Sequence, residues 1–129
     1  MKIVVYGTLR RGGSLNGYLG ADQKYIETKR IEGWDMFSLN AYPYIRRGEG
    51  SIVVDVFDVS EDNFDRTSQM ERAAGYEVTE IADGAMFYAP EDESWMDGSH
   101  PLVENGDWSD YRLRAQQELR DWWDSKTNG

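Results

Sequence analysis

The side chains in this sequence that could take part in chemistry are mainly carboxylates and guanidinium groups. The 129 residues include 24 Asp and Glu, 14 Lys and Arg, one His and no Cys. The absence of cysteine excludes disulfides, thiolate catalysis and Cys-based zinc sites. The basic pairs Arg10-Arg11 and Arg46-Arg47 could form local positive spots that receive a small anion. The net charge of −10 argues against a nucleic-acid partner, because nucleic-acid-binding proteins normally present a basic surface.

The acidic run Glu91-Asp92-Glu93, with Asp97 and His100 after it, is the one segment in which a metal site can be imagined. It lacks the spacing of an EF-hand loop, and a single His is a poor start for a zinc site. A solvated loop is therefore the preferred interpretation, and no metal is expected.

The bulk composition predicts a single-domain, cytoplasmic protein that spans residues 1–129. Such a length supports one hydrophobic core but not two. The apolar run at the N-terminus is too short for a signal peptide and is interrupted by Gly7, and no stretch is long enough to cross a membrane. A chain without cysteine is also consistent with a reducing compartment.

The first element that could position reactive groups is a strand that ends in a loop. The β-branched run from Ile3 to Tyr6 predicts a buried strand, which stops at Gly7. Residues 10–14 are typical of a loop, and Arg10 and Arg11 are expected at the surface, where one could reach a carboxylate of a ligand. Taken alone, this segment is simply a strand that ends in a turn.

The remaining pattern predicts an α+β fold: a mixed, curled β-sheet or small barrel with one or two packed helices. Strands are expected over 25–34, 36–39 and 51–59, and a hairpin over 76–88 turns at Asp83-Gly84. Ser60 is the expected N-cap of a helix that runs through Glu71.

A last helix is expected over about 108–125. Tyr111, Ala115, Leu119 and Trp122 form one stripe at helical spacing, with Trp123 beside it. Such a stripe predicts that the helix docks on the core, with a dimer contact as the alternative.

The segment Val4-Val5-Tyr6-Gly7-Thr8-Leu9-Arg10-Arg11-Gly12 resembles the N-terminal signature of the γ-glutamylcyclotransferase-like superfamily. In that family a first strand ends in Tyr-Gly-Ser/Thr-Leu and opens into a substrate-binding loop. The family's order continues with Asn16, Gly33 and Pro43, and residues 50–59 resemble its central strand. Glu71 lies about where the family places its essential acid, so the resemblance covers roughly residues 3–90.

The resemblance implies an enzyme that cyclises a γ-glutamyl amine or peptide to 5-oxoproline and releases the amine, without a cofactor. It implies that Glu71 is the general base and then the general acid, a role that requires a partly buried carboxyl with a raised pKa. Glu77 and Glu80 are the fallback acids. The implied substrate contacts are Tyr6, Gly7, Thr8, Leu9 and Arg10, with Tyr76 or Tyr88 as a hydroxyl donor to the oxyanion.

A second hypothesis is a non-catalytic relative that keeps the fold and pocket and binds a small molecule or a protein. The residues around Glu71 differ from the family pattern, since Arg72 stands where a Gly is common and Tyr76 is followed by Glu77-Val78. The position of Glu71 distinguishes the two hypotheses: a cavity beside the Gly7-Thr8-Leu9 amides favours the enzyme, and a solvent face favours the binding protein. Under either hypothesis a monomer or a weak homodimer is expected.

Overall fold

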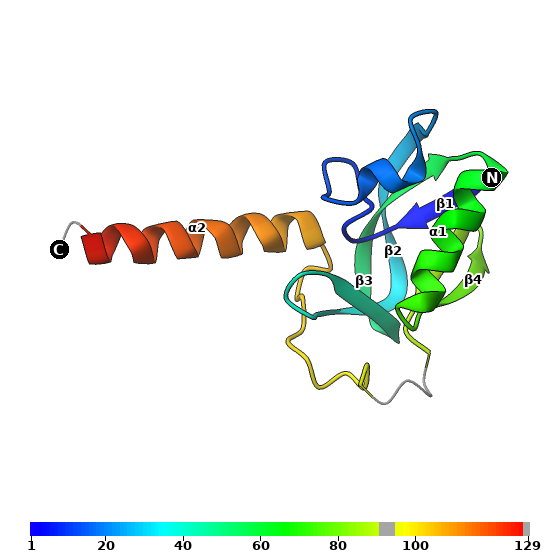
Figure 1. Cartoon of the computed structure of the whole chain (residues 1–129). Helices are drawn as coiled ribbons and strands as arrows, with labels where there is room; N and C mark the ends of the chain where they lie inside the picture. Colours follow the sequence, from blue (N-terminus) through cyan, green and yellow to red (C-terminus); the bar gives the residue numbers. More distant parts are fainter. Residues whose placement is uncertain (91–94, 128–129) are drawn as a thin grey trace.

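The computed structural model describes residues 1–90 and 95–127, which form a body and one projecting helix (Figure 1). The acidic run at residues 91–93 lies outside the described residues, so its predicted solvated loop stays a prediction. In chain order the elements are β1 (Lys2–Val5), the short 3-10 helix η1 (Asn16–Leu19), β2 (Lys24–Ser38), β3 (Pro43–Asp58), α1 (Glu61–Ala73), β4 (Glu77–Ile81), β5 (Gly84–Tyr88) and α2 (Trp108–Thr127).

The five strands form one mixed sheet in the order β2-β3-β1-β5-β4. The central strand β1 pairs antiparallel with β3 and parallel with β5, and the predicted hairpin is the antiparallel pair β4-β5. The predicted α+β class with a mixed sheet is confirmed. The sheet of the described residues is open, with β2 and β4 at its edges, rather than closed into a barrel.

The two strands predicted over 25–34 and 36–39 are one continuous strand, β2. It pairs with β3 from Lys24 to Ser38, and the register shifts between Glu32 and Trp34. Gly33 lies at this shift with a φ of 94°, a conformation that glycine adopts without strain. A β-bulge at Gly33 therefore bends the strand where the sequence pattern predicted that it would end.

Each face of the sheet carries a hydrophobic cluster because the side chains of β1 alternate between the faces. Ile3 and Val5 belong to the cluster that α1 covers, through partly buried Phe64 and Met70. Val4 belongs to the second cluster, whose members include Trp34, Ile52, Val54, Met86 and Trp108. The predicted N-cap of α1 is confirmed, since the Ser60 hydroxyl accepts the N–H of Asn63 at 3.2 Å.

The predicted docking of the last helix on the core is wrong. Only Trp108, at the start of α2, is buried, and every residue from 113 to 127 is exposed. The helix leaves the body at its first turn and continues into solvent (Figure 1). Its first turn is held by polar contacts and by Trp108 and Tyr111, which pack in the second cluster, whereas the rest of the stripe, from Ala115 to Trp122, is exposed.

Among the described helices, none combines the length and the apolar character that crossing a bilayer requires.

Candidate active site

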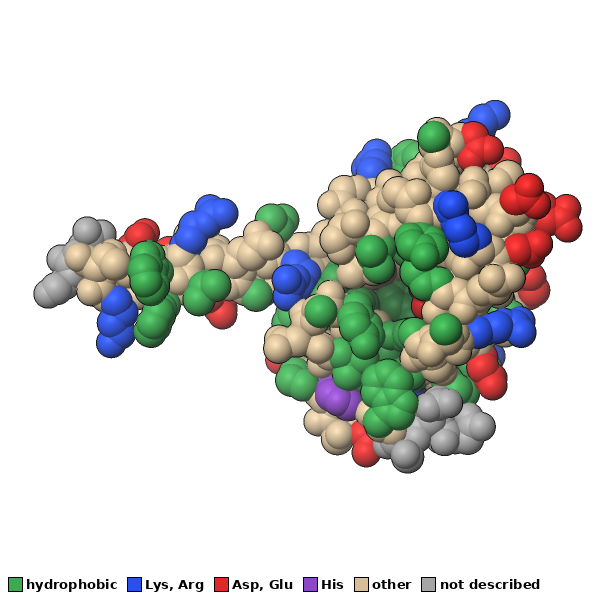
Figure 2. Space-filling view, viewed as in Figure 1, with side chains coloured by type: hydrophobic (Ala, Val, Ile, Leu, Met, Phe, Trp, Pro, Cys, Tyr) green, Lys and Arg blue, Asp and Glu red, His purple; other side chains and the backbone are tan. Residues whose placement is uncertain are grey.

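A cavity of about 380 Å³ opens between the loop after β1, the turn before β3 and the C-terminal end of α1. Figure 2 shows the body hollowed on this face, with hydrophobic side chains around the opening. The described lining residues are Val4, Val5, Tyr6, Gly7, Thr8, Leu9, Ser14, Leu15, Ala41, Tyr42, Pro43, Met70, Glu71, Ala74, Tyr76 and Phe87. The cavity thus brings together most of the residues that the sequence singled out.

The loop after β1 uses its carbonyl groups internally and leaves its amides available. The carbonyls of Gly7, Thr8 and Leu9 accept hydrogen bonds from the Arg10 N–H, the Leu15 N–H and the Asn16 side chain at 2.9–3.0 Å. Within the described residues, the N–H groups of Gly7, Thr8 and Leu9 meet no acceptor. Successive free amides of this kind can hold a carboxylate or an oxyanion.

Gly7 is required by packing. A Cβ at this position would lie 2.8 Å from the Cγ and Cδ atoms of Pro43, which is too close for a carbon–carbon contact. The Pro43 ring therefore fixes the course of the loop from the side of the cavity. The resemblance implied that Gly7 is a substrate contact, and the structure adds that its close packing neighbour is Pro43.

Glu71 comes from the last turns of α1 and lines the cavity. Its side chain is partly buried and has no hydrogen-bond or ion-pair partner among the described residues. Burial alone raises the pKa of Glu71 to about 7 from an ordinary value of 4.5. The carboxyl can therefore gain and lose a proton near neutral pH, as a general acid–base group must.

Two buried tyrosines lie near Glu71. Burial, followed by the charge of Glu71, raises the pKa of Tyr76 far above its ordinary value, and burial likewise raises the pKa of Tyr6. Both therefore stay protonated. The Tyr76 hydroxyl donates its hydrogen to the Pro43 carbonyl at 2.8 Å. This hydrogen bond links the residue before β4 to the start of β3. The hydroxyl proton is therefore not free to be donated to an oxyanion.

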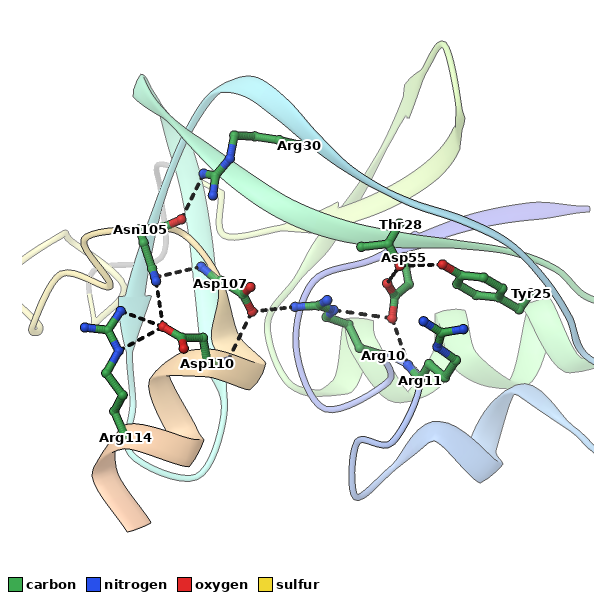
Figure 3. Close-up of polar contacts among 10 residues, drawn as sticks. All are labelled: Arg10, Arg11, Tyr25, Thr28, Arg30, Asp55, Asn105, Asp107, Asp110 and Arg114. Atoms are coloured by element: carbon green, nitrogen blue, oxygen red, sulfur yellow. Dashed lines mark hydrogen bonds and ion pairs between the residues drawn. The ribbon is translucent and has the colours of Figure 1, made fainter. Parts of the chain in front are cut away.

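Arg10 lies outside the cavity lining, and the prediction that it is exposed is wrong. Its side chain is buried, with Nε 3.3 Å from the Asp55 carboxylate and Nη1 2.8 Å from that of Asp107 (Figure 3). Asp55 also accepts the Arg11 N–H at 2.9 Å and the Thr28 hydroxyl at 2.6 Å. A buried carboxylate attracts the guanidinium inward because neither charge is stable alone in the interior.

Tyr88 is the other predicted contact that lies outside this cavity. Side chains alternate along β5, so Phe87 lines the cavity and Tyr88 faces the opposite side. There its ring packs edge-on against Trp34 at 5.6 Å. The fallback acids Glu77 and Glu80 are exposed on β4 and do not line the cavity.

The sequence analysis missed Asp55 and Asp107 as the groups that hold the loop. Asp55 carried a signal, because it is the only charged residue between Ile52 and Phe57 in an otherwise apolar strand. A charge in such a strand must be paired when the strand is buried. Asp107 carried no comparable signal. In the described part of the chain, no cluster of three acidic, His or Cys side chains could hold a metal ion.

A family model described as gamma-glutamyl cyclotransferase, AIG2-like, matches residues 3–110. The chain belongs to this family. The resemblance seen in residues 4–12 is thereby confirmed. A Pyrococcus horikoshii relative, whose own name assigns it only provisionally as a gamma-glutamylcyclotransferase, is 33% identical over 118 residues, which cover 87% of this chain and 94% of the relative.

Solved structures agree with this membership of the gamma-glutamyl cyclotransferase, AIG2-like family. The crystal structure of the same P. horikoshii protein superposes with a TM-score of 0.74 at 28% identity and covers 91% of this chain and 97% of that chain. An allophanate hydrolase from Kluyveromyces lactis gives a TM-score of 0.71 at 16% identity over 85% of this chain and 20% of that chain. This second likeness shows the fold alone, and one fold can host different activities.

Proposed function

We propose that this protein is a γ-glutamyl cyclotransferase that converts a γ-glutamyl amine to 5-oxoproline and the free amine. The observation that carries this proposal is the unpaired, partly buried Glu71 in the same cavity as the free amides of the Gly7-Thr8-Leu9 loop. A carboxylate that serves only solubility would lie in solvent with an ordinary pKa. The family membership supports the same reaction class.

The first task of the cavity is to fold the substrate so that its α-amine meets its γ-carbonyl. The loop amides hold the α-carboxylate, and the apolar walls exclude water from the bent chain. Such orientation is powerful because effective molarities of well-placed intramolecular reactions reach about 10⁵–10⁸ M. The nucleophile and the electrophile belong to one molecule, so no protein nucleophile is needed.

The second task is proton transfer, which we assign to Glu71. As a carboxylate it takes a proton from the α-ammonium, and the free amine attacks the γ-carbonyl to form the ring C–N bond. The protonated Glu71 then gives the proton to the departing nitrogen as the original amide C–N bond breaks. The attacking nitrogen still carries one extra proton, which it loses to the expelled amine, so the products are 5-oxoproline and the amine in its ammonium form. Atoms and charge then balance without water or cofactor, and the Glu71 carboxylate is regenerated.

The lining of the cavity favours an uncharged leaving group. Among the described lining residues none is a Lys or Arg, and the exposed large hydrophobic ones, Leu15 and Tyr42, make an apolar rim. A leaving amino acid would bring its own carboxylate to this rim without a cation to pair it. Burying such a charge without a partner is costly.

We expect kcat/KM for γ-glutamyl-n-butylamide to exceed that for γ-glutamylglycine by at least about tenfold, the effect of roughly 1.4 kcal/mol of desolvation. The measurement follows 5-oxoproline released from both compounds by purified protein. Release from the amide alone, or a strong preference for it, supports the proposal. No release from any γ-glutamyl compound would overturn the catalytic assignment and leave the non-catalytic binding protein.

The value of kcat/KM is expected to fall as the pH decreases below 7. The base form of Glu71 is the carboxylate, and its pKa is raised to about 7, so acidification through this range protonates the base before the substrate binds. We expect a loss of about tenfold per pH unit on the acid side. A profile measured from pH 5 to 9 that stays level down to pH 5 would show that another group acts as the base.

A further inference from the structure

Helix α2 presents large apolar side chains that nothing in the described structure covers. Leu119 is 67% exposed, Trp122 53% and Trp123 60%. In proteins, packing of an apolar face supplies most of the stability of a helix, and the part of α2 beyond its first turn has no such packing in the described structure. Tryptophan is also among the residue types enriched in the residues that contribute most of the binding energy of protein interfaces. The exposed face of the helix therefore has the properties of a protein interface without its partner.

The start of α2 is fixed, so the exposed stripe cannot fold back onto its own body. The Asp107 carboxylate accepts the Asp110 N–H of the first turn at 3.2 Å and also pairs with the buried Arg10 (Figure 3). Arg112 donates to the Asn40 carbonyl at 2.7 Å, and Trp108 is buried in the core. Beyond this anchor the helix continues straight into solvent (Figure 1).

We propose that the partner of α2 is the α2 helix of a second copy of this chain, packed antiparallel. Charge is the first argument. The helix has four basic and four acidic residues, namely Arg112, Arg114, Arg120 and Lys126 against Asp110, Glu118, Asp121 and Asp124. The net charge of −10 therefore lies on the rest of the chain, and α2 is the neutral part through which two copies can approach.

The same charge selects the antiparallel orientation. A 20-residue helix is about 30 Å long, and both bodies are attached at the N-terminal end. Antiparallel packing places the two acidic bodies at opposite ends, farther apart than the Debye length of about 8 Å at physiological salt. Parallel packing would bring the bodies side by side, where like charges repel and their surfaces collide.

The sizes of the side chains in the stripe support the same arrangement. When Leu119 lies at the two-fold axis, Ala115 of one helix faces the Trp122-Trp123 pair of the other. A small residue opposite a bulky one fills space without a clash, and a two-fold axis repeats the match on both sides. Parallel packing would instead oppose Trp122 to Trp122 and leave a gap between the two Ala115 side chains.

The contact is expected to be weak. One face of the helix, about 30 Å long and 10 Å wide, is smaller than the roughly 800 Å² that each partner contributes to a standard interface. We therefore expect a dimer that forms at micromolar or higher concentration. A membrane surface is the less suitable partner, because the polar side of α2 has as many acidic as basic residues.

The decisive experiment compares Leu119→Glu with Leu113→Glu by sedimentation equilibrium over a concentration series. The two leucines are matched in exposure, 67% and 66%, but Leu113 lies on the opposite side of the helix from the stripe. The wild type should show a monomer–dimer equilibrium, Leu119→Glu should weaken it at least tenfold, and Leu113→Glu should leave it unchanged. A monomeric wild type, or equal effects of both variants, would overturn the proposal.

The orientation is tested with a spin label on Ser125→Cys, which is the only cysteine of that variant. Antiparallel helices centred on Leu119 separate the two labelled residues by about 18 Å along the axis. Parallel helices would place them about 10 Å apart and would overturn the antiparallel arrangement. Binding of the monomer to anionic phospholipid vesicles, lost in Leu119→Glu, would overturn the second copy as the partner.

Discussion

Replacing Glu71 with Gln is expected to reduce the rate of 5-oxoproline formation by at least about 10²-fold. The amide cannot take the proton of the α-ammonium or return one to the departing amine, and such proton transfers contribute roughly 10²–10⁴-fold. The shape of the cavity is kept because Gln and Glu are nearly isosteric. We therefore expect the loss in kcat with little change in KM, measured with the preferred γ-glutamyl amide at pH 8.

Glu77→Gln is the matched control, since Glu77 is a nearby acid exposed on β4 and absent from the cavity lining. It should keep wild-type activity. Equal release by Glu71→Gln and the wild type would remove Glu71 from the mechanism.

The stability of Glu71→Gln provides an independent test of the buried charge. The folded protein binds the Glu71 proton more tightly than the unfolded chain, because the pKa rises from 4.5 to about 7 on folding. The unfolding free energy of the wild type therefore falls as the pH increases from about 4.5 to 7. Above pH 7, Glu71→Gln should be more stable by up to about 3 kcal/mol, and this gain should disappear near pH 4. An inactive variant with this gain is folded.

Replacing Asp55 with Ala is expected to lower the free energy of unfolding by about 3–5 kcal/mol. Asp55 is 1% exposed and pairs with the Arg10 guanidinium, the Arg11 N–H and the Thr28 hydroxyl (Figure 3). Removing one member of a buried pair leaves the other charge without compensation, which accounts for the size of the effect. Urea unfolding followed by far-UV circular dichroism measures it.

Asp58→Ala is the control for this substitution. Asp58 lies three residues along the same strand and pairs with the N-terminal amine at 3.0 Å, but both groups are exposed. Exposed pairs contribute roughly 0–1 kcal/mol, so this variant should be nearly as stable as the wild type. If both variants lose similar stability, the Arg10–Asp55 pair does not hold the loop as the geometry indicates.

The local signals in the sequence were sufficient for most of the elements. The β-branched run at Ile3, the Ser60 cap and the Asp83-Gly84 turn each predicted an element that the structure contains. These predictions succeeded because each depends on interactions among residues a few positions apart. The prediction that a strand ends at Gly33 was wrong because it used only local information. Glycine weakens a strand locally, but the pairing of β2 with β3 continues past Gly33 through a bulge.

The candidate site was predicted in part. Tyr6 to Leu9, Glu71 and Tyr76 line one cavity, whereas Arg10 and Tyr88 lie outside it. The position of Arg10 depends on Asp55 and Asp107, which are 45 and 97 residues away in the chain. Alternation along β5 puts Tyr88 on the opposite face from the residue before it. Which of the two faces meets the cavity depends on the pairing of β5 with β1.

The sequence by itself determined most of the strands and helices along the chain, a loop after the first strand, and an amphipathic last helix. These features follow from bond geometry and side-chain periodicity. Only the tertiary structure decided that Glu71 lies partly buried without a partner among the described residues, which arginine is enclosed by carboxylates, and that the last helix leaves the body. Burial and charge pairing depend on contacts between distant segments, because desolvation is a property of the surroundings and not of the residue.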